Sequence, residues 1–219
     1  ESNRPEIFKR YNFIIVESEE FNACAFPSGF IMITTGTIKQ IKANGGGEDE
    51  IAAIVAHEIA HVNLRHPEIA ANQMYSKQET AKTLSVASGL VWEVWKVTDP
   101  EGAKKTGLSD EDVKKLTEGL GELVNLFGDV VNNGYGRDQE LAADVLAVDL
   151  MNRAGYNPQA LKRVLSKLPK SAQGWLAPSH PTADERIKKI SGPLKAVKHT
   201  PSDEAKRKER FQAKTRNIG

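Results

Sequence analysis

The stretch from residue 49 to residue 65 constrains the fold most, because the helix it predicts is apolar on almost every side. Its apolar residues are Ile51, Ala52, Ala53, Ile54, Val55, Ala56, Ile59, Ala60 and Val62. The acidic residues Glu48, Asp49 and Glu50 stand at its N-terminus, where the helix dipole favours negative charge. We expect the helix to end before Pro67. Because a helix without a polar face is stable only when other elements cover it, we expect it to be buried.

Composition places the chain among ordinary globular proteins. Its 219 residues carry 30 Lys and Arg against 29 Asp and Glu, which gives a net charge of +1. This near-neutral balance argues against a nucleic-acid partner. The single cysteine, Cys24, excludes an intramolecular disulfide and a cysteine-rich zinc ribbon. No apolar run approaches the roughly 20 residues that a transmembrane helix needs.

The N-terminal part predicts a small antiparallel sheet. Residues 11–16 are rich in aromatic and β-branched types, which favour a strand. Residues 21–26 and 30–35 are predicted as two more strands. The turn Pro27-Ser28-Gly29 joins them and favours a hairpin.

Helical patterns dominate the rest of the chain, so we expect an α+β protein that is mostly α. The predicted helices cover residues 68–97, 137–153, 158–168 and 181–191. We expect one domain over residues 1–194, followed by a basic extension over residues 195–219. The extension carries eight Lys and Arg against three Asp and Glu, together with Phe211, and is predicted to be a solvated helix or disordered.

The buried helix contains the sequence His57-Glu58-Ile59-Ala60-His61. Two histidines four residues apart lie on one face of a helix, so their ring nitrogens can converge on a metal ion. Zinc fits best, because it takes nitrogen and oxygen ligands and keeps one position for water at a catalytic site. Glu58 can then accept the proton of that water. A buried pair of histidines without a ligand would leave polar nitrogens unsatisfied.

A third ligand is needed, and Glu140 is the best candidate. It lies 140 − 61 = 79 residues after His61, on a separate helix whose other residues are small and apolar. Asp144 follows one turn later on the same face and could accept a hydrogen bond from one of the histidines, which fixes its tautomer. The alternative is that Glu140 and Asp144 form a solvated acidic edge beside Arg137 and Arg153.

Four segments together resemble the M48 family of zinc metallopeptidases. They are Asn22–Gly36, His57–His61 with the following Arg65-His66, Arg137–Asp144, and Ser179–Ile187, and they occur in the family's order. The resemblance implies a gluzincin-like minimal metalloprotease, with a helical body around one zinc ion. Membrane-bound branches of the family carry membrane helices, so the absence of an apolar run points to the soluble branch.

The resemblance also implies roles for individual residues. The zinc ligands would be His57, His61 and Glu140. Glu58 would be the general base and acid, and Asp144 would support a ligand histidine. His180 would either stabilise the developing oxyanion or occupy the open zinc position in a resting form.

Other residues near these motifs have less defined roles. Arg186 could orient Asp144 or Glu140, or pair with Glu185 at the surface. His66 is interpreted as structural. The segment 98–136 is polar or rich in glycine, and we treat a lid over the cleft as a hypothesis.

The function predicted from these residues is a zinc endopeptidase that acts on extended or misfolded polypeptides. Substrate would bind by adding a strand to residues 21–34. The alternative is a chaperone-like or assembly-factor interaction module with a latent zinc site, in which His180 is a fourth ligand. Water at the fourth position would favour the enzyme.

The expected location is the bacterial periplasm or cell envelope, with the cytoplasm as the alternative. No signal peptide is visible, and the chain begins at Glu1 rather than Met, so we expect upstream residues that are not in this sequence. The basic tail could contact anionic lipid as a peripheral attachment, although a solvated extension is the simpler interpretation.

Overall fold

The computed structural model describes residues 11–26, 29–75, 135–168, 181–197 and 203–218. The chain divides into two units. Residues Glu1–Pro67 and Val131–Gly219 form the first, and Glu68–Val130 form the second. The sheet and the helices discussed below belong to the first unit, apart from most of α3 (His66–Tyr75), which belongs to the second.

The three-stranded sheet is mixed rather than antiparallel. Its strands are β1 (Asn12–Val16), β2 (Ala23–Ala25) and β3 (Phe30–Thr34), in the spatial order β1-β3-β2. The expected hairpin of β2 and β3 is confirmed, but β1 pairs parallel with β3. The prediction of a wholly antiparallel sheet was wrong because β3 lies between the other two strands. The chain reverses direction between β1 and β2 and again between β2 and β3. The first and third strands therefore run in the same direction, and they pair because β3 lies next to β1.

Threonines at the end of β3 hold the segment that carries the chain from β1 to the far edge. The Thr34 hydroxyl donates to the Glu20 carbonyl at 2.6 Å, and the Thr37 hydroxyl donates to the Asn22 carbonyl at 2.8 Å. Gly36 lies against the same segment, and a Cβ atom at this position would lie 2.4 Å from the Glu19 carbonyl oxygen. This close approach requires glycine, and it fixes where β2 begins.

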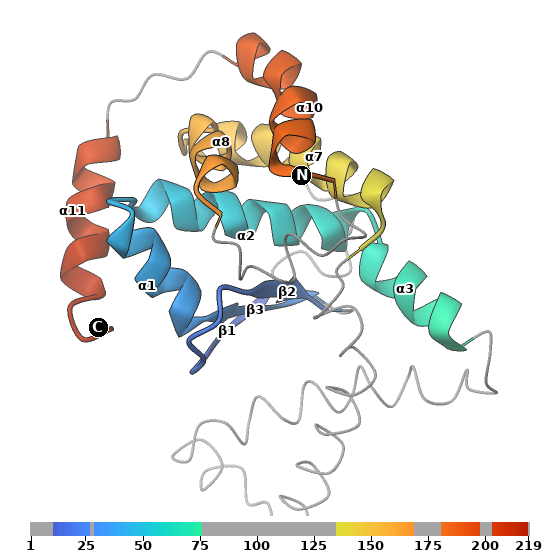
Figure 1. Cartoon of the computed structure of the whole chain (residues 1–219), viewed down its shortest axis with the longest axis horizontal. Helices are drawn as coiled ribbons and strands as arrows, with labels where there is room; N and C mark the ends of the chain where they lie inside the picture. Colours follow the sequence, from blue (N-terminus) through green and yellow to red (C-terminus); the bar gives the residue numbers. More distant parts are fainter. Residues whose placement is uncertain (1–10, 27–28, 76–134, 169–180, 198–202, 219) are drawn as a thin grey trace, which may run out of the picture. The chain divides into compact units, whose positions relative to one another are not determined.

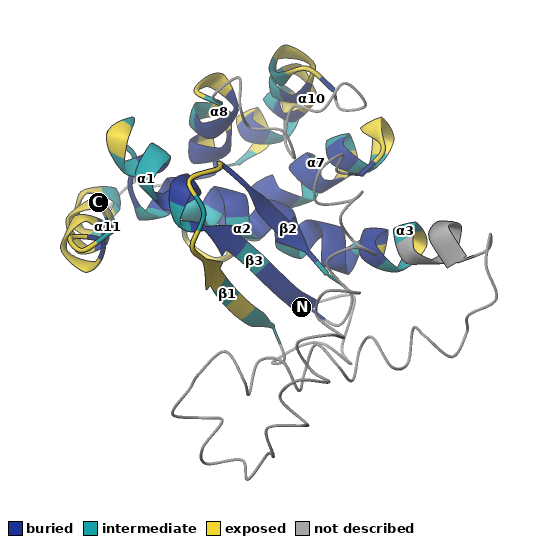
Figure 2. Ribbon diagram, turned by 60° about the horizontal axis from the view of Figure 1, so that its bottom comes forward, coloured by how far each residue is buried: buried dark blue, intermediate teal, exposed yellow. Residues whose placement is uncertain are grey.

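Helix α2 (Glu48–Asn63) is the buried helix that the sequence predicts. It contacts β2 and β3 as well as the helices α7 (Arg137–Arg153), α8 (Gln159–Ser166) and α11 (Glu204–Lys214), so it lies between the sheet and a helical layer (Figure 1). Most of its surface is buried, and Ala53, Ile54 and Ala60 are inaccessible to solvent (Figure 2). One stripe of α2 is only half-buried, at Ile51 and Val55, where it lines an apolar groove of about 330 Å³.

Among the remaining helices, α7 has the bounds that the sequence predicts, and α8 lies within the predicted residues 158–168. Their bounds are α1 (Thr35–Ala43), α7 (Arg137–Arg153), α8 (Gln159–Ser166), α10 (Ala183–Ala196) and α11 (Glu204–Lys214). The expected α+β architecture, mostly α, is thereby confirmed. The part of residues 68–97 that follows Tyr75 lies outside the described residues. Within the described ranges, no helix has the length and apolar character to cross a membrane.

Helix α10 runs past the position at which the sequence predicts its end. Pro193 lies inside the helix, where it removes one backbone hydrogen bond. Ile190 and Leu194 are four residues apart and both are buried in the main core. Their packing holds the last turn in helical form despite the proline.

Helix α11 lies within the residues expected to form a basic extension, and it packs on the N-terminal end of α2. Arg207 donates two hydrogen bonds to Asp49, at 2.6 and 3.1 Å, and Arg210 pairs with Glu48. Phe211 is buried in the core. The acidic N-terminal end of α2 therefore binds the basic helix α11. The number of charged residues in the tail does not by itself show that α2 is its partner.

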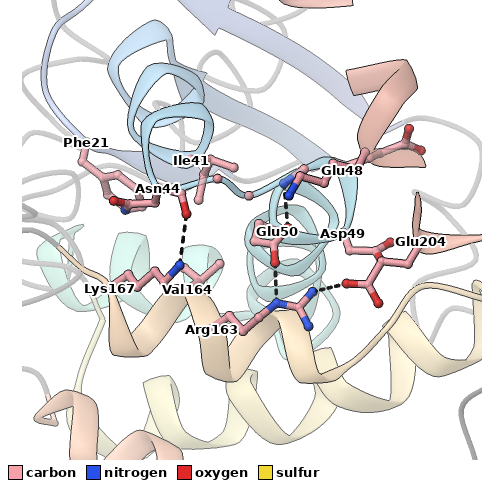
Figure 3. Close-up of a pocket in the computed structure, with 14 residues that line it drawn as sticks. Phe21, Ile41, Asn44, Glu48, Asp49, Glu50, Arg163, Val164, Lys167 and Glu204 are labelled. Carbon is pink, nitrogen blue, oxygen red and sulfur yellow. Dashed lines mark hydrogen bonds and ion pairs between the residues drawn. The ribbon is translucent and has the colours of Figure 1, made fainter. Parts of the chain in front are cut away.

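A cavity of about 260 Å³ lies where α11, α8 and the start of α2 meet (Figure 3). Arg163 on α8 bridges Glu50 and Glu204 across it, with both distances 2.6 Å. Lys167 donates to the carbonyl of Asn44 on another wall, at 3.0 Å. These opposite charges neutralise one another, so the cavity serves as a junction between helices.

Phe211→Ala is expected to lower the free energy of unfolding by about 3 kcal/mol, because a buried aromatic ring is removed without a group to replace it. Urea denaturation followed by circular dichroism measures the change. The exposed neighbour Gln212 provides the control, since Gln212→Ala should change stability by less than about 0.5 kcal/mol. Equal stability of Phe211→Ala and the unaltered protein would show that α11 does not contribute to the core.

Candidate metal centre

Two histidines of α2 project from one face of the helix toward the same point. The Nε2 atoms of His57 and His61 are 3.0 Å apart, one helical turn from each other. Their side chains are 2% and 1% exposed. This arrangement follows from the helical repeat, because residues i and i+4 lie one above the other.

Helix α7 brings Glu140 to the two imidazoles. One carboxylate oxygen of Glu140 lies 3.2 Å from Nε2 of His57, and the other lies 3.5 Å from Nε2 of His61. Zinc bonds nitrogen and oxygen at about 2.0–2.2 Å in a tetrahedron, which places neighbouring donors about 3.4 Å apart. The three observed separations are close to this value, so the donor set fits a zinc ion.

Burial decides against the alternative of a solvated acidic edge. Glu140 is 3% exposed and Asp144 is fully buried. The exposed Arg137 pairs instead with Glu185 of α10, at 2.6 Å. Arg186, which could have paired with Glu185, is directed into the interior. That alternative for Glu140 and Asp144 was therefore wrong.

Asp144 and Arg186 form a buried ion pair behind His57. The guanidinium of Arg186 donates two hydrogen bonds to the Asp144 carboxylate, both at 2.7 Å. Asp144 in turn lies 3.0 Å from Nδ1 of His57. A hydrogen bond on Nδ1 sets the tautomer that leaves Nε2 free to bind a metal. Three helices, α2, α7 and α10, thus contribute to the position of one imidazole.

The start of α10 fixes where Arg186 lies. Thr182 caps the helix, because its hydroxyl accepts a hydrogen bond from the backbone N–H of Glu185 at 3.3 Å. The Glu185 carboxylate accepts a hydrogen bond from the Thr182 N–H at 2.7 Å. Such a capping box defines the first turn. It directs the residue after Glu185 toward α7.

His66 supports the second histidine of the pair. Nδ1 of His66 lies 2.8 Å from Nδ1 of His61, a hydrogen bond in which one of the two nitrogens donates. Arg65 makes this contact possible. Its φ of 60° is in the left-handed region, which ends the helical course of α2 and changes the direction of the chain before His66. The sequence interpretation of His66 as merely structural missed this contact. Its position five residues after His61 was the available signal.

Tyr135 covers the site and was missed altogether. Its ring stacks on His61, with centroids 4.2 Å apart, and its phenol donates to the Ala25 carbonyl at 2.8 Å. Its backbone N–H donates to a carboxylate oxygen of Glu140 at 3.3 Å. The glycines around it suggested only a loosely specified segment, so the residue pattern carried no signal for this role.

Glu58 is buried beside the candidate ligands and bonded to the sheet. The backbone N–H of Ala25 in β2 donates to its carboxylate, and the side chain is 3% exposed. Burial raises the pKa of the Glu58 carboxyl to about 7. A group with this pKa can accept and release a proton near neutral pH.

The electrostatics of the site favour a cation between the ligands. Burial alone lowers the pKa of His57, but its hydrogen bonds with Asp144 and Glu140 raise the value to about 9. Burial holds the pKa of His61 well below the usual range. His57, which lies nearest the carboxylates of Asp144 and Glu140, therefore keeps a proton when no metal is bound. A metal ion at this place would supply the positive charge in place of that proton.

Two sequence predictions lie outside the described residues. His180, expected near the metal, is among residues 169–180. Of residues 98–136, which the sequence analysis treats as a hypothetical lid, only Tyr135 and Gly136 are among the described residues.

Comparisons with known proteins agree with this arrangement. Residues 2–194 match the model of peptidase family M48. The beta-barrel assembly-enhancing protease of Yersinia pestis is 25% identical over all of this chain, which spans 41% of that protein's length. The metalloprotease LoiP of Escherichia coli is 26% identical over 84% of this chain and 63% of its own length. The mitochondrial metalloendopeptidase OMA1 of Schizosaccharomyces pombe is 26% identical over 89% of the chain and 50% of its own length.

The family match includes both helices that carry the buried ligand set, and it extends over most of the sequence. Relatives from bacteria and from yeast mitochondria are named as proteases of this kind. The chain belongs to peptidase family M48, whose members are metallopeptidases.

Proposed function

We propose that this chain is a zinc-dependent endopeptidase that hydrolyses peptide bonds of extended or misfolded proteins with a metal-activated water. The observation that carries the proposal is the convergence of His57, His61 and Glu140, whose donor atoms all lie within 4.8 Å of one another. Glu58, the residue next to His57, is buried at the same place. Membership of family M48 supports the same chemistry.

Each residue of the candidate site has a separate proposed role in hydrolysis. Zinc, when bound to the three ligands, supplies Lewis-acid activation of a water molecule and of the scissile carbonyl. Glu58 accepts the proton of the attacking water and transfers it to the leaving amine nitrogen, and burial of its carboxyl favours proton uptake by raising the pKa. We assign His180 the stabilisation of the developing oxyanion. Asp144 and Arg186 keep His57 oriented.

The edge of β2 is the proposed path of the substrate backbone. This strand is one of the two outer strands of the sheet and lies within residues 21–34. Its Ala25 touches Glu58, so a peptide added to this edge would pass beside the general base. Pairing through main-chain groups would make cleavage tolerant of the substrate sequence.

The proposed location is the bacterial periplasm or cell envelope, with the cytoplasm as the alternative. Support comes from the relatives in Yersinia pestis and Escherichia coli that are named beta-barrel assembly-enhancing proteases. These relatives are longer than this chain, so their substrates and partners need not be shared.

Metal analysis tests the ligand set. The purified protein should contain one zinc ion per chain, and Glu140→Ala should lose most of it because an anionic ligand is removed. Asp138→Ala is the control, since Asp138 is exposed on the same helix. Atomic emission spectrometry gives the zinc content. Full zinc occupancy in Glu140→Ala would remove Glu140 from the ligand set.

Glu58→Gln tests the assignment of the base. We expect zinc to stay bound while cleavage of unfolded casein falls about 10²–10⁴-fold, because the amide cannot accept the proton. Chelation should abolish cleavage in the unaltered protein, and added zinc should restore it. Cleavage at the normal rate in Glu58→Gln would refute the assignment. A protein that never cleaves, but binds casein equally with and without zinc, would be the chaperone-like interaction module.

Asp144→Asn tests how His57 is positioned. The amide keeps the shape of the side chain but weakens its hydrogen bond to the imidazole, so zinc affinity should fall about 10–100-fold. Competition with a chromophoric chelator measures the affinity. Asp149→Asn on the exposed face of α7 should leave it unchanged. An unaltered affinity in Asp144→Asn would mean that Asp144 serves only the stability of the helix packing.

A further inference from the structure

The outer edge of β2, which pairs with no other strand of the described residues, is contacted at Ala25 by side chains of the candidate site. In the pairing with β3, the Asn22 carbonyl accepts from the N–H of Thr34, and the N–H of Phe26 donates to the Phe30 carbonyl. Antiparallel strands alternate between residues that face the partner strand and residues that face away. The backbone groups of Ala23 and Ala25 therefore point to the open edge.

Both outward groups of Ala25 already have partners. Its N–H donates to the carboxylate of Glu58, and its carbonyl accepts the phenol of Tyr135 at 2.8 Å. A peptide that adds to β2 needs this same carbonyl for one of its own backbone N–H groups. The Tyr135 side chain is 5% exposed, so it fills the position closely.

We propose that Tyr135 is a gate residue, which a substrate backbone must displace from the Ala25 carbonyl before it can pair with β2. This inference rests on the proposed function and adds to it how access to the site is controlled. The gate also covers the ligand set, because the ring stacks on His61. Displacement of the Tyr135 side chain would thus expose both the edge of β2 at Ala25 and the imidazole of His61.

The start of α7 is held by a contact that does not involve the Tyr135 side chain. Helix α7 begins at Arg137, and the N–H of Gly136 is capped by the Gln139 side chain at 3.0 Å. This cap holds the first turn of α7, and with it Glu140, independently of the Tyr135 side chain. The hydrogen bond from the phenol to the Ala25 carbonyl is a neutral one, which a substrate N–H can replace.

Tyr135→Phe separates the gate from a purely structural role, because it keeps the ring that stacks on His61 and removes the competing phenol. With the full chain loaded with zinc and a quenched fluorescent peptide as substrate, we expect KM to fall about 3–10-fold, the effect of one neutral hydrogen bond. We expect kcat to stay within about twofold of the original value. Tyr156→Phe is the matched control, because that phenol bonds Glu48 and lies outside the site, so KM should not change.

Binding measured without turnover provides a second readout. In a Glu58→Gln background, fluorescence anisotropy with the same labelled peptide should show a dissociation constant that falls by the same factor when Tyr135→Phe is added. An unchanged or raised KM and dissociation constant would overturn the gate. A tenfold loss of kcat would also overturn it and make the phenol a catalytic donor.

The two proposals fail in distinguishable ways. Absence of cleavage by the zinc-loaded protein contradicts the endopeptidase, whereas the binding comparison still decides whether Tyr135 competes with a peptide. Zinc content and melting temperature should match between the Tyr135→Phe variant and its parent, which would confirm that the phenol hydroxyl is not needed to maintain the site.

Discussion

The buried ion pair between Arg186 and Asp144 links the three helices that build the site. Both side chains are fully buried, and removal of either one would leave an uncompensated charge in the interior. The pair therefore holds α10 against α7, and through the imidazole of His57 it holds α7 against α2. The same contact that joins the helices also fixes the tautomer of His57, a proposed metal ligand. Stability and the geometry of the candidate metal site consequently depend on one group of atoms.

Charge balance explains why such a centre suits a divalent ion. Glu58, Glu140 and Asp144 are three buried carboxyl groups, and Arg186 is the guanidinium buried with them. With all of them ionised, the cluster carries two negative charges more than positive ones, and burial makes that excess costly. The raised pKa values of His57 and Glu58 accord with this excess, because each group binds a proton more readily than it does in water. A doubly charged cation would neutralise the excess without either proton.

The sequence predicts the parts of this site that depend on local periodicity, and it misses those that depend on distant contacts. The i, i+4 spacing of His57 and His61 and the bounds of α7 follow from the helical repeat, so both were predictable. The parallel pairing of β1 depends on how threonines of one segment bind the backbone of another. The stacking of Tyr135 on His61 likewise joins segments far apart in the chain. The tail shows the same limit, because Arg207 has its partner Asp49 158 residues away.

Ala25 couples the sheet to the reaction chemistry. Its N–H faces the proposed base Glu58, and its carbonyl faces the position where a substrate backbone would pair. The side chains of a strand repeat every two residues, so a peptide paired with β2 can shift only in steps of two without reversing the faces that its side chains present. Pairing at Ala25 would therefore bring a peptide group of the substrate to Glu58 in each of these registers, whatever the substrate sequence. Selectivity would then come from access to the edge, which Tyr135 controls, more than from pockets that recognise particular side chains.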